Sequence, residues 1–571
     1  MTRPSRLVPA RWPDLLLVVG VTLLVLGPVL LDRGFVLVGD MVFVPDQPWK
    51  DTWTGGDGGV PRAVPGDAIV SLLTTVVPGE VLQRLVLAGT FLGAGAGMSR
   101  LTRDLPFLAR AAGIMAFLWN PYVHERLAIG HWALLCGYAA LPWVASAVVT
   151  LRERGDGGDD VRRSRRRAWA LLAVALAVAG WGSPTGGVLT TVTALVLALG
   201  RTRRALGVLG LGLFVNLPWI VPAFGNGADQ LAPDAFGVQA FASRADTPYG
   251  LVGSLLTFGG IWKESIVPPD RGDVLSATVG LVLVLVAAYG WWASRRDPVL
   301  PWRHALGLGV GALALALLGG VSSLEGLVEW VVVHAPGGGL LRDGQKWVAP
   351  WALVASVGLA AAVAHLRERS VRRTQSGQAW LVCFLLAPVA ALPSLALGLG
   401  GFLHSDEFPD QWHDVRAEME RLAVADDLVV VLPFSTYRRF DWTPRTILDP
   451  APRFFPGRMV TEDALTVPEG TVGGESALAA RVRGAEGADE LATVLSEAGV
   501  RWALVHRSSE EFTLPTGARV VEDGEQLALW RLVDPVGEDA WTGEWRPVAY
   551  AVLDLLVLCG TVGVALRFTL R

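Results

Sequence analysis

Two acidic residues in the first polar segment of the chain are suited to proton transfer. Asp40 and Asp46 follow the first long apolar run, and Trp49 comes shortly after them. A carboxylate can accept the proton of a sugar hydroxyl that attacks a glycosidic carbon. Gly39 lets the backbone turn tightly before Asp40, and the apolar residues after Asp40 are expected to raise its pKa by excluding water. We predict that Asp40, or failing it Asp46, is a general base and that Trp49 contacts the acceptor. The alternative is a solvated loop aspartate or a group that caps a turn.

A second polar segment, between two later apolar runs, contains His124, Glu125, Arg126 and His131. Arg126 and His131 are candidates for contacting a phosphate, and His124 and Glu125 for contacting a sugar. The two histidines and the glutamate could also bind a metal, but their spacing matches no strong ligand pattern. We therefore assign no metal site. The alternative is an interfacial anchor with a Glu125–Arg126 ion pair.

A third polar segment combines flexible backbone with two cations. Three glycines at 337–339 precede Arg342, Gln345 and Lys346 within a few residues. Such a segment offers hydrogen-bond donors and positive charge to a phosphate whose lipid tail lies in a membrane. It does not match a nucleotide-binding P-loop, which needs Gly-Lys-Ser/Thr after a strand. The alternative is a surface loop with an Arg342–Asp343 pair.

Charged residues of the 223–272 segment are weaker candidates. We interpret Arg244, Asp246, Lys263 and Glu264 as solvated loop charges. Near the end of the chain, Tyr437 and Trp442 lie among charged residues, as aromatic residues do on sugar-binding surfaces. We predict both as acceptor-binding residues; aromatic packing between two parts of the protein would give the same pattern.

The composition indicates the kind of fold that holds these candidate residues in place. The chain has 571 residues, of which 52% are hydrophobic, and its mean hydropathy is positive. A sequence this long and apolar predicts a polytopic α-helical membrane protein. Its three cysteines all lie in apolar runs, which excludes a disulfide framework. Apolar runs of roughly 17 to 22 residues predict about twelve membrane-spanning helices, near 14–31, 81–98, 106–120, 132–150, 168–182, 185–200, 205–222, 273–292, 304–320, 349–366, 379–399 and 547–567.

Arginine clusters predict the orientation, because basic residues near helix ends are retained in the cytoplasm. One orientation places every cluster inside, so we predict both termini in the cytoplasm. The chain then divides into a multi-span membrane domain (1–399), an extracytoplasmic domain (400–546) and a final helix with a short cytoplasmic tail (547–571). The outward loops of the membrane domain are 32–80, 121–131, 223–272 and 321–348. The fifth and sixth apolar runs nearly meet at residues 181–186, and this pair could therefore form broken or re-entrant helices.

The segment 400–546 is expected to form a small α/β domain. Residues 409–424 predict an amphipathic helix, 427–434 a buried strand, and 489–498 a helix before a strand at 500–505. Asp523-Gly524 predicts a hairpin turn between strands. About 140 residues are enough to bury a core without disulfides.

The motifs together resemble a known class of membrane enzyme. Gly39-Asp40 after the first helix, NPYVHERLAIGHWALLCGYAALPW at 120–143 and LLRDGQKWVAP at 340–350 resemble the membrane region of actinobacterial arabinofuranosyltransferases and, more loosely, YfhO-type proteins. Both are similar to the GT-C glycosyltransferases. The resemblance implies a polyprenyl-phosphate sugar donor, an outward active site, and a base that corresponds to Asp40 or Asp46. Unlike the family pattern, the two acids are six positions apart rather than adjacent, and the chain lacks the very long carbohydrate-binding extension.

These observations predict an integral-membrane glycosyltransferase of cell-wall biogenesis. It would move a sugar, which the resemblance suggests is arabinofuranose, from a polyprenyl-phosphate donor to a glycan or glycolipid acceptor. The lipid bilayer is the other expected partner, and nucleic acid is not expected. The sequence identifies no cofactor with certainty, and a divalent cation stays an open alternative. A transporter or flippase for lipid-linked saccharides would instead bury ionisable residues at mid-membrane, and a non-catalytic scaffold would leave Asp40 without a cavity.

Overall fold

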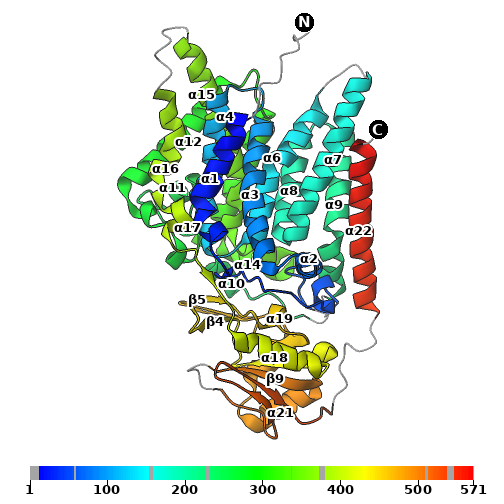
Figure 1. The fold of residues 1–571 in the computed structure, drawn as a ribbon. Helices are drawn as coiled ribbons and strands as arrows, with labels where there is room; N and C mark the ends of the chain where they lie inside the picture. The colour runs from blue at the N-terminus through cyan, green and yellow to red at the C-terminus, as the bar shows by residue number, and fades with distance from the viewer. Residues whose placement is uncertain are drawn as a thin grey trace.

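The computed structural model describes residues 12–56, 59–153, 158–226, 230–335, 337–371, 380–507, 512–536 and 545–569. Long helices form a bundle, and nearly all the strands gather at one end of it (Figure 1). The start of the first helix and the end of the last lie at the other end (Figure 1). This arrangement agrees with the predicted topology, in which both termini face one side and residues 400–546 the other; the side of the membrane stays a prediction.

Among the described residues, seven helices are long and apolar enough to cross a bilayer. Many large apolar side chains face outward from them; Leu285 and Leu555, for example, are 62% and 58% exposed. Such surfaces are stable against lipid but not against water. The seven are α1 (Trp12–Leu31), α3 (Gly79–Leu101), α6 (Trp132–Arg152), α9 (Thr202–Gly225), α12 (Val274–Ala293), α15 (Val348–Val371) and α22 (Arg546–Thr569).

Two further stretches pass the same test only as bent pairs. One pair comprises α13 (Trp302–Leu318) and α14 (Ser322–His334), which meet at 93°; the other, Trp380–Ala391 and Pro393–Gly400, meets at 71° and includes α16 (Cys383–Ala391), η8 (Pro393–Leu395) and α17 (Ala396–Gly400). The remaining predicted spans correspond to α4 (Phe107–Leu118), α7 (Asp159–Gly182) and α8 (Pro184–Ala198). All twelve predicted segments therefore contain helix, whereas a count of twelve crossings stays a prediction.

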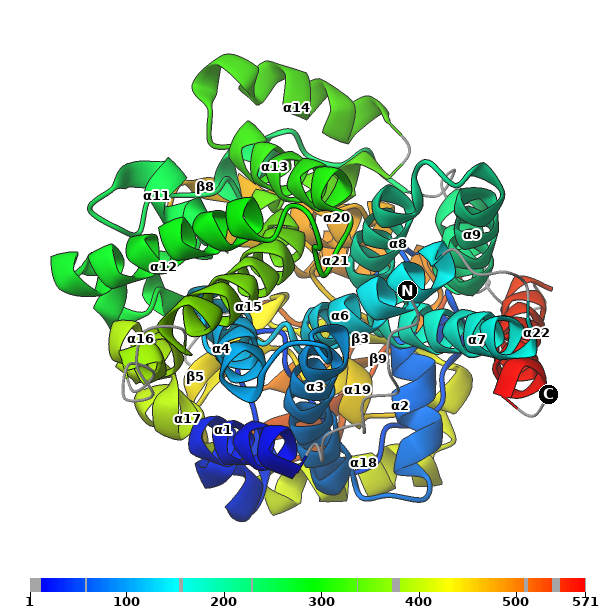
Figure 2. The same ribbon diagram turned by 90° about the horizontal axis from the view of Figure 1, so that it is seen from above.

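The segment predicted as broken or re-entrant, 181–186, is a tight turn. Ser183 alone separates α7 from α8, and its hydroxyl accepts a hydrogen bond from the Gly186 N–H at 3.1 Å. This contact satisfies one of the free N–H groups at the start of α8. The two helices lie side by side in the bundle (Figure 2).

Short elements cover the strand-containing end of the bundle. The first loop contributes a two-residue strand, β1, which pairs antiparallel with β2 through Phe35 and Asp406. Strand β2 lies near the start of residues 400–546, which we name the outer domain after their predicted orientation. This pairing fastens the first loop to a segment about 370 positions away. The short elements are β1 (Phe35–Val36), η1 (Asp51–Thr54), α2 (Gly66–Thr74), α5 (Pro121–Ala128), α10 (Phe236–Ala240), α11 (Gly250–Leu256), η3 (Glu264–Ile266), η4 (Pro269–Gly272), η5 (Gly338–Leu341), η6 (Gly344–Trp347) and β2 (Ser405–Asp406).

The outer domain contains a five-stranded sheet in the order β10-β11-β9-β3-β6. Strand β3 is parallel to β9 and β6, and β11 is antiparallel to β9 and β10. The predicted helices, strands and hairpin of this region agree with the structure to within a few residues. The elements are α18 (Asp410–Arg421), η9 (Val424–Asp426), β3 (Leu428–Leu432), β4 (Tyr437–Phe440), β5 (Thr443–Leu448), α19 (Ala451–Phe454), β6 (Arg458–Val460), β7 (Leu465–Val467), β8 (Gly470–Val472), α20 (Ala477–Gly484), α21 (Ala488–Glu497), β9 (Val500–His506), β10 (Arg519–Asp523) and β11 (Leu527–Arg531).

Candidate active site

Two glycines bring the first loop against the turn between α5 and α6. Gly39 has φ +49°, and a Cβ there would lie 2.2 Å from the carbonyl oxygen of Ile129. Gly130 has φ +85°, and a Cβ there would lie 2.2 Å from the carbonyl oxygen of Val38. Any other residue would clash and be strained at either position. The close approach allows the Asp40 N–H to donate to the Ile129 carbonyl at 3.0 Å, so Asp40 is placed beside His131.

Both oxygens of the Asp40 carboxylate accept hydrogen bonds. His131 Nε2 lies 3.1 Å from Oδ2, and the Tyr437 hydroxyl donates to Oδ1. On its other side, His131 Nδ1 lies 2.9 Å from Nη1 of Arg126. A guanidinium only donates, so Nδ1 must accept and the proton must sit on Nε2. A neutral His131 therefore holds the Asp40 carboxylate in place, and 38% of the Asp40 side chain stays exposed.

The pKa of Asp40 is lowered, which corrects the expectation drawn from its apolar neighbours. Met41 to Val44 are indeed buried, and burial alone would raise the pKa of the carboxyl. The hydrogen bonds that His131 and the Tyr437 hydroxyl donate, together with the positive charge of Lys346, outweigh burial and bring the pKa to about 2. Asp40 is therefore an ionised acceptor at neutral pH.

Arg126, from α5, joins the first loop to the segment before α15. Its side chain is fully buried, and its guanidinium donates to both carboxylate oxygens of Asp343, at 2.8 and 3.1 Å. It also donates to Gln345 Oε1, while Gln345 Nε2 donates to Glu125 at 2.8 Å. We name Asp40, His131, Arg126, Asp343, Gln345 and Glu125 the outer polar cluster.

The pairing within this cluster differs from both ion pairs considered above. Arg126 pairs with Asp343 rather than with its neighbour Glu125. Asp343 in turn does not pair with Arg342, which instead lies 3.0 Å from Glu475 of the outer domain. Consecutive residues of a helix point about 100° apart, so Glu125 and Arg126 face different partners.

Glu125 has the opposite protonation preference from Asp40. It is fully buried, and burial followed by the charge of nearby Asp246 raises its pKa well above the ordinary value. Asp246 is itself 2% exposed and pairs with Arg271 at 2.7 Å. The interpretation of Asp246 as a solvated loop charge is therefore wrong. Glu264 is exposed, as expected.

Cations from two separate segments lie near Asp40. Lys346 lies 3.7 Å from Asp343 and acts electrostatically on Asp40. Burial lowers the pKa of Lys263, against the opposing effect of the Asp40 charge. Lys263 was expected to be solvated, but its side chain is partly buried within electrostatic reach of Asp40. Arg342 lies within electrostatic reach of Lys346. The arrangement gives a carboxylate base with positive charge nearby.

Four other predicted site residues lie apart from the outer polar cluster. Asp46 is 56% exposed and pairs with Arg416 at 3.0 Å, and Trp49 is 47% exposed. His124 is buried, and its charge interaction is with Asp270. Trp442 packs among aromatic rings, 5.7 Å from Trp412, as the packing alternative anticipated.

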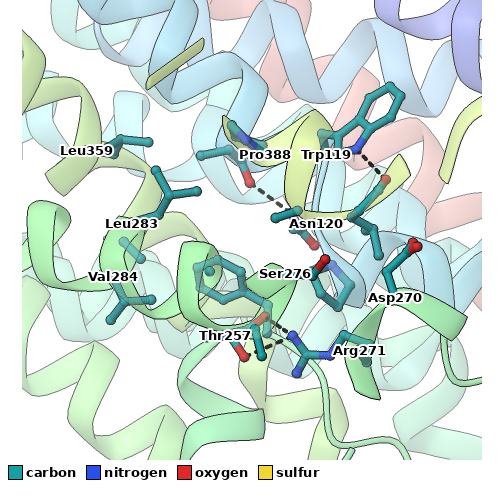
Figure 3. A pocket seen from close by; sticks show the side chains of 18 of the residues that line it. Trp119, Asn120, Thr257, Asp270, Arg271, Ser276, Leu283, Val284, Leu359 and Pro388 are labelled. Atoms are coloured by element: carbon teal, nitrogen blue, oxygen red, sulfur yellow. Dashed lines mark hydrogen bonds between the residues drawn. The ribbon is translucent and has the colours of Figure 1, made fainter. Parts of the chain in front are cut away.

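A small apolar pocket lies next to the first residues of α5 (Figure 3). It is about 50 Å³ in volume and is lined mainly by α12, with further residues from α4, α15 and α16, and Asn120, Asp270 and Arg271 are among its polar residues. Ligand pockets usually measure about 300 to 1,000 Å³. The pocket is therefore too small to hold a lipid chain as it stands, and we base no function on it.

The described residues contain no group of three or more His, Cys, Asp or Glu side chains able to hold a metal ion. His131, one of the residues considered as a ligand, is engaged at both ring nitrogens. The structure thus does not bring His124, Glu125 and His131 together around one point.

Comparison with known proteins supports the fold predicted from the motifs. No family model and no curated protein matches the sequence. The structure is similar to the arabinofuranosyltransferase AftD from Mycobacteria, with a TM-score of 0.56 at 17% identity over 94% of this chain. A mutant form of AftD, R1389S, gives a TM-score of 0.57 at 16% identity over 92% of this chain. This chain covers only 41% of AftD.

A second neighbour is ArnT from Cupriavidus metallidurans bound to undecaprenyl phosphate, with 15% identity over 93% of this chain and all of ArnT. Its TM-score is 0.39, too low to support a conclusion. The resemblance to GT-C glycosyltransferases that the sequence motifs indicated is thus confirmed at the level of fold, through AftD.

Proposed function

We propose that the chain is a multi-pass membrane glycosyltransferase that transfers a sugar from a polyprenyl-phosphate donor to a hydroxyl of a glycan or glycolipid. The observation that carries the proposal is the outer polar cluster, in which a half-buried neutral histidine orients an ionised, partly exposed carboxylate among cations. The fold shared with AftD supports the reaction class. Arabinofuranose is the sugar we favour, because AftD is an arabinofuranosyltransferase.

In this proposal Asp40 Oδ1 accepts the proton of the acceptor hydroxyl. The hydroxyl oxygen attacks the anomeric carbon of the donor, and the bond between that carbon and the phosphate oxygen breaks. One carboxylate is enough for such a direct displacement, which inverts the anomeric centre. The Tyr437 hydroxyl already donates to Oδ1, so it marks the direction from which an acceptor hydroxyl would approach.

The departing polyprenyl phosphate carries the negative charge released by bond cleavage. Lys346 and Arg342, which are 25% and 20% exposed, supply positive charge where that phosphate would lie. Arg126 is tied to Asp343 and Gln345 and is better placed to hold the cluster than to bind substrate. Fixed cations at a developing charge are usually a large part of catalysis.

Replacing Asp40 by Asn tests the base directly. Asp40→Asn keeps the side-chain shape but removes the proton acceptor, and we expect transfer to fall at least about a thousandfold. The measurement is sugar transfer from a polyprenyl-phosphate donor by the purified protein. Asp46→Asn is the matched control, because Asp46 lies in the same loop outside the cluster, and it should keep at least half of the activity. Undiminished activity of Asp40→Asn would reject the assignment.

Lys346→Ala and Arg342→Ala test the phosphate position. Each removes one cation facing the leaving group, so we expect KM for the donor to rise about tenfold or more, with little change in acceptor preference. Lys50→Ala serves as a control for losing a lysine near the outer domain, since its ammonium donates to the Pro452 carbonyl at 2.6 Å instead. If these two variants changed only the kinetics of the acceptor, the donor phosphate would have to bind away from Lys346 and Arg342.

A further inference from the structure

A charged cavity lies near the start of α7, at the opposite end of the bundle from the outer polar cluster. Its volume is about 430 Å³, within the usual range of ligand sites. The residues around it come from the last turns of α3 and α6, the turn after α3 and the first turns of α7, at the end farthest from the strands (Figure 1). They are Arg100, Arg103, Thr150, Asp160, Arg163, Ser164, Arg167 and Ala168.

The lining of this cavity is strongly positive. It contains four arginines and one aspartate. Arg163 and Arg167 form no ion pair within the described part of the chain, and Arg103 lies 3.8 Å from the highly exposed Asp104. Thr150 and Ser164 add hydroxyl groups. Arginines with hydroxyl donors around a cavity of this size suit a phosphate ester.

An apolar helix face leads away from the cavity along α7. Residues 163, 167, 171, 174 and 178 follow one another at intervals of three or four, which places them on one face of the helix. The first two are the cavity arginines, Leu171 is partly buried, and Val174 and Val178 are 47% and 50% exposed. The face therefore changes from basic to apolar as it enters the span.

Helix α3, which like α7 packs against α6, repeats this pattern. Below Arg100 the same face carries Ala96, Leu92, Gly89 and Leu85, and all four are exposed. A Cβ added at Gly89 would meet no atom within 4 Å, so this face is open. Helix α6 packs against both α3 and α7. Two apolar faces thus descend from one basic cavity.

We propose that this cavity binds the headgroup of an anionic phospholipid, with its acyl chains against the exposed faces of α3 and α7. A soluble phosphate would use the arginines but would gain nothing from the apolar faces below them. A lipid uses both, because its phosphate sits at the membrane surface and its chains run into the hydrocarbon. Since basic ends face the cytoplasm, the lipid belongs to the inner leaflet. The site is separate from the outer polar cluster and does not depend on the proposed reaction.

The test is binding of dioctanoyl-phosphatidylglycerol to the delipidated full-length protein in detergent, followed by native mass spectrometry. Arg163→Gln/Arg167→Gln should weaken binding at least tenfold. Arg162→Gln/Arg166→Gln removes the same charge from the same turns of α7 outside the cavity, and it should weaken binding less than threefold. Ser164→Trp fills the cavity without changing charge and should also abolish binding.

Two further probes separate a lipid from other ligands. Dioctanoyl-phosphatidylcholine tests whether net negative charge is needed, and glycerol phosphate tests whether the chains are needed; both should bind at least tenfold more weakly. Equal losses in the two double variants, unchanged binding by Ser164→Trp, or glycerol phosphate binding as tightly as the anionic lipid would each overturn the proposal. The same holds if the wild-type protein binds none of the probes.

Discussion

The two ends of the outer polar cluster hold carboxyl groups that differ in protonation. Asp40 accepts from His131 and Tyr437 and lies near Lys346, and its pKa falls to about 2. Glu125 accepts from Gln345, is fully buried and lies near Asp246, and its pKa rises. Burial acts in the same direction on both, so the donors and charges around each group decide the outcome.

This difference supports the roles proposed for the two acids. A base must be ionised and within reach of substrate, and only the partly exposed Asp40 meets both conditions. A neutral, fully buried Glu125 instead completes the hydrogen bonds of Gln345. Sites in which two acids have pKa values pushed apart commonly divide their roles in this way.

Arg126→Gln should have the largest effect, because Arg126 contacts both His131, which bonds Asp40, and Gln345, which bonds Glu125. It would leave Asp343 buried without its guanidinium, and loss of one partner of a buried pair costs roughly 3 to 5 kcal/mol. We expect a lower thermal midpoint and loss of transfer activity. The measurements are thermal unfolding in detergent and a donor assay. Arg416→Gln, which removes the partner of the exposed Asp46, should change neither by much; an Arg126→Gln protein as stable as wild type would contradict the buried pair.

Tyr437→Phe should change the pKa of Asp40 and leave Glu125 unaffected. The Tyr437 hydroxyl lowers the pKa of Asp40, so its removal should raise that pKa, and less Asp40 would be ionised in acid. With a wild-type pKa of about 2, Asp40 itself causes no loss of kcat/KM between pH 4 and 8. In Tyr437→Phe the acid limb should move to higher pH, with a loss of less than about tenfold at neutral pH. A pH–rate profile checks this, and an acid limb displaced to lower pH would contradict the assignment of Tyr437.

Much of the site could be predicted from the sequence because topology groups the loops. Alternating arginine clusters place the segments of Asp40, His131 and Lys346 on one side, and the structure brings these three close together. Side-chain partners could not be predicted in the same way. Arg126 pairs with Asp343, more than 200 positions away in the sequence, because α5 and η6 pack close together in the fold.

The outer domain shows the same limit. Its elements followed from periodicity and turn signals, but nothing local indicates that Tyr437 reaches Asp40. That contact depends on how strands β4 and β5 dock on the first loop, where the Leu448 N–H donates to the Gly39 carbonyl at 2.8 Å. The pKa of Asp40 was predicted in the wrong direction for this reason, since the apolar neighbours were visible in the sequence and the donors were not.

Glu125→Gln should have the smallest effect, and it tests whether Glu125 is neutral in the folded protein. A protonated glutamate and a glutamine have nearly the same shape and charge, and the new carbonyl oxygen can still accept from Gln345. We therefore expect activity within about threefold of wild type and an unchanged thermal midpoint. Glu125→Ala is the contrasting variant, because it leaves Gln345 Nε2 without its acceptor and should cost about 1 to 3 kcal/mol. If Glu125→Gln were as inactive as Asp40→Asn, Glu125 would have to act as a carboxylate, and the division of roles between the two acids would be wrong.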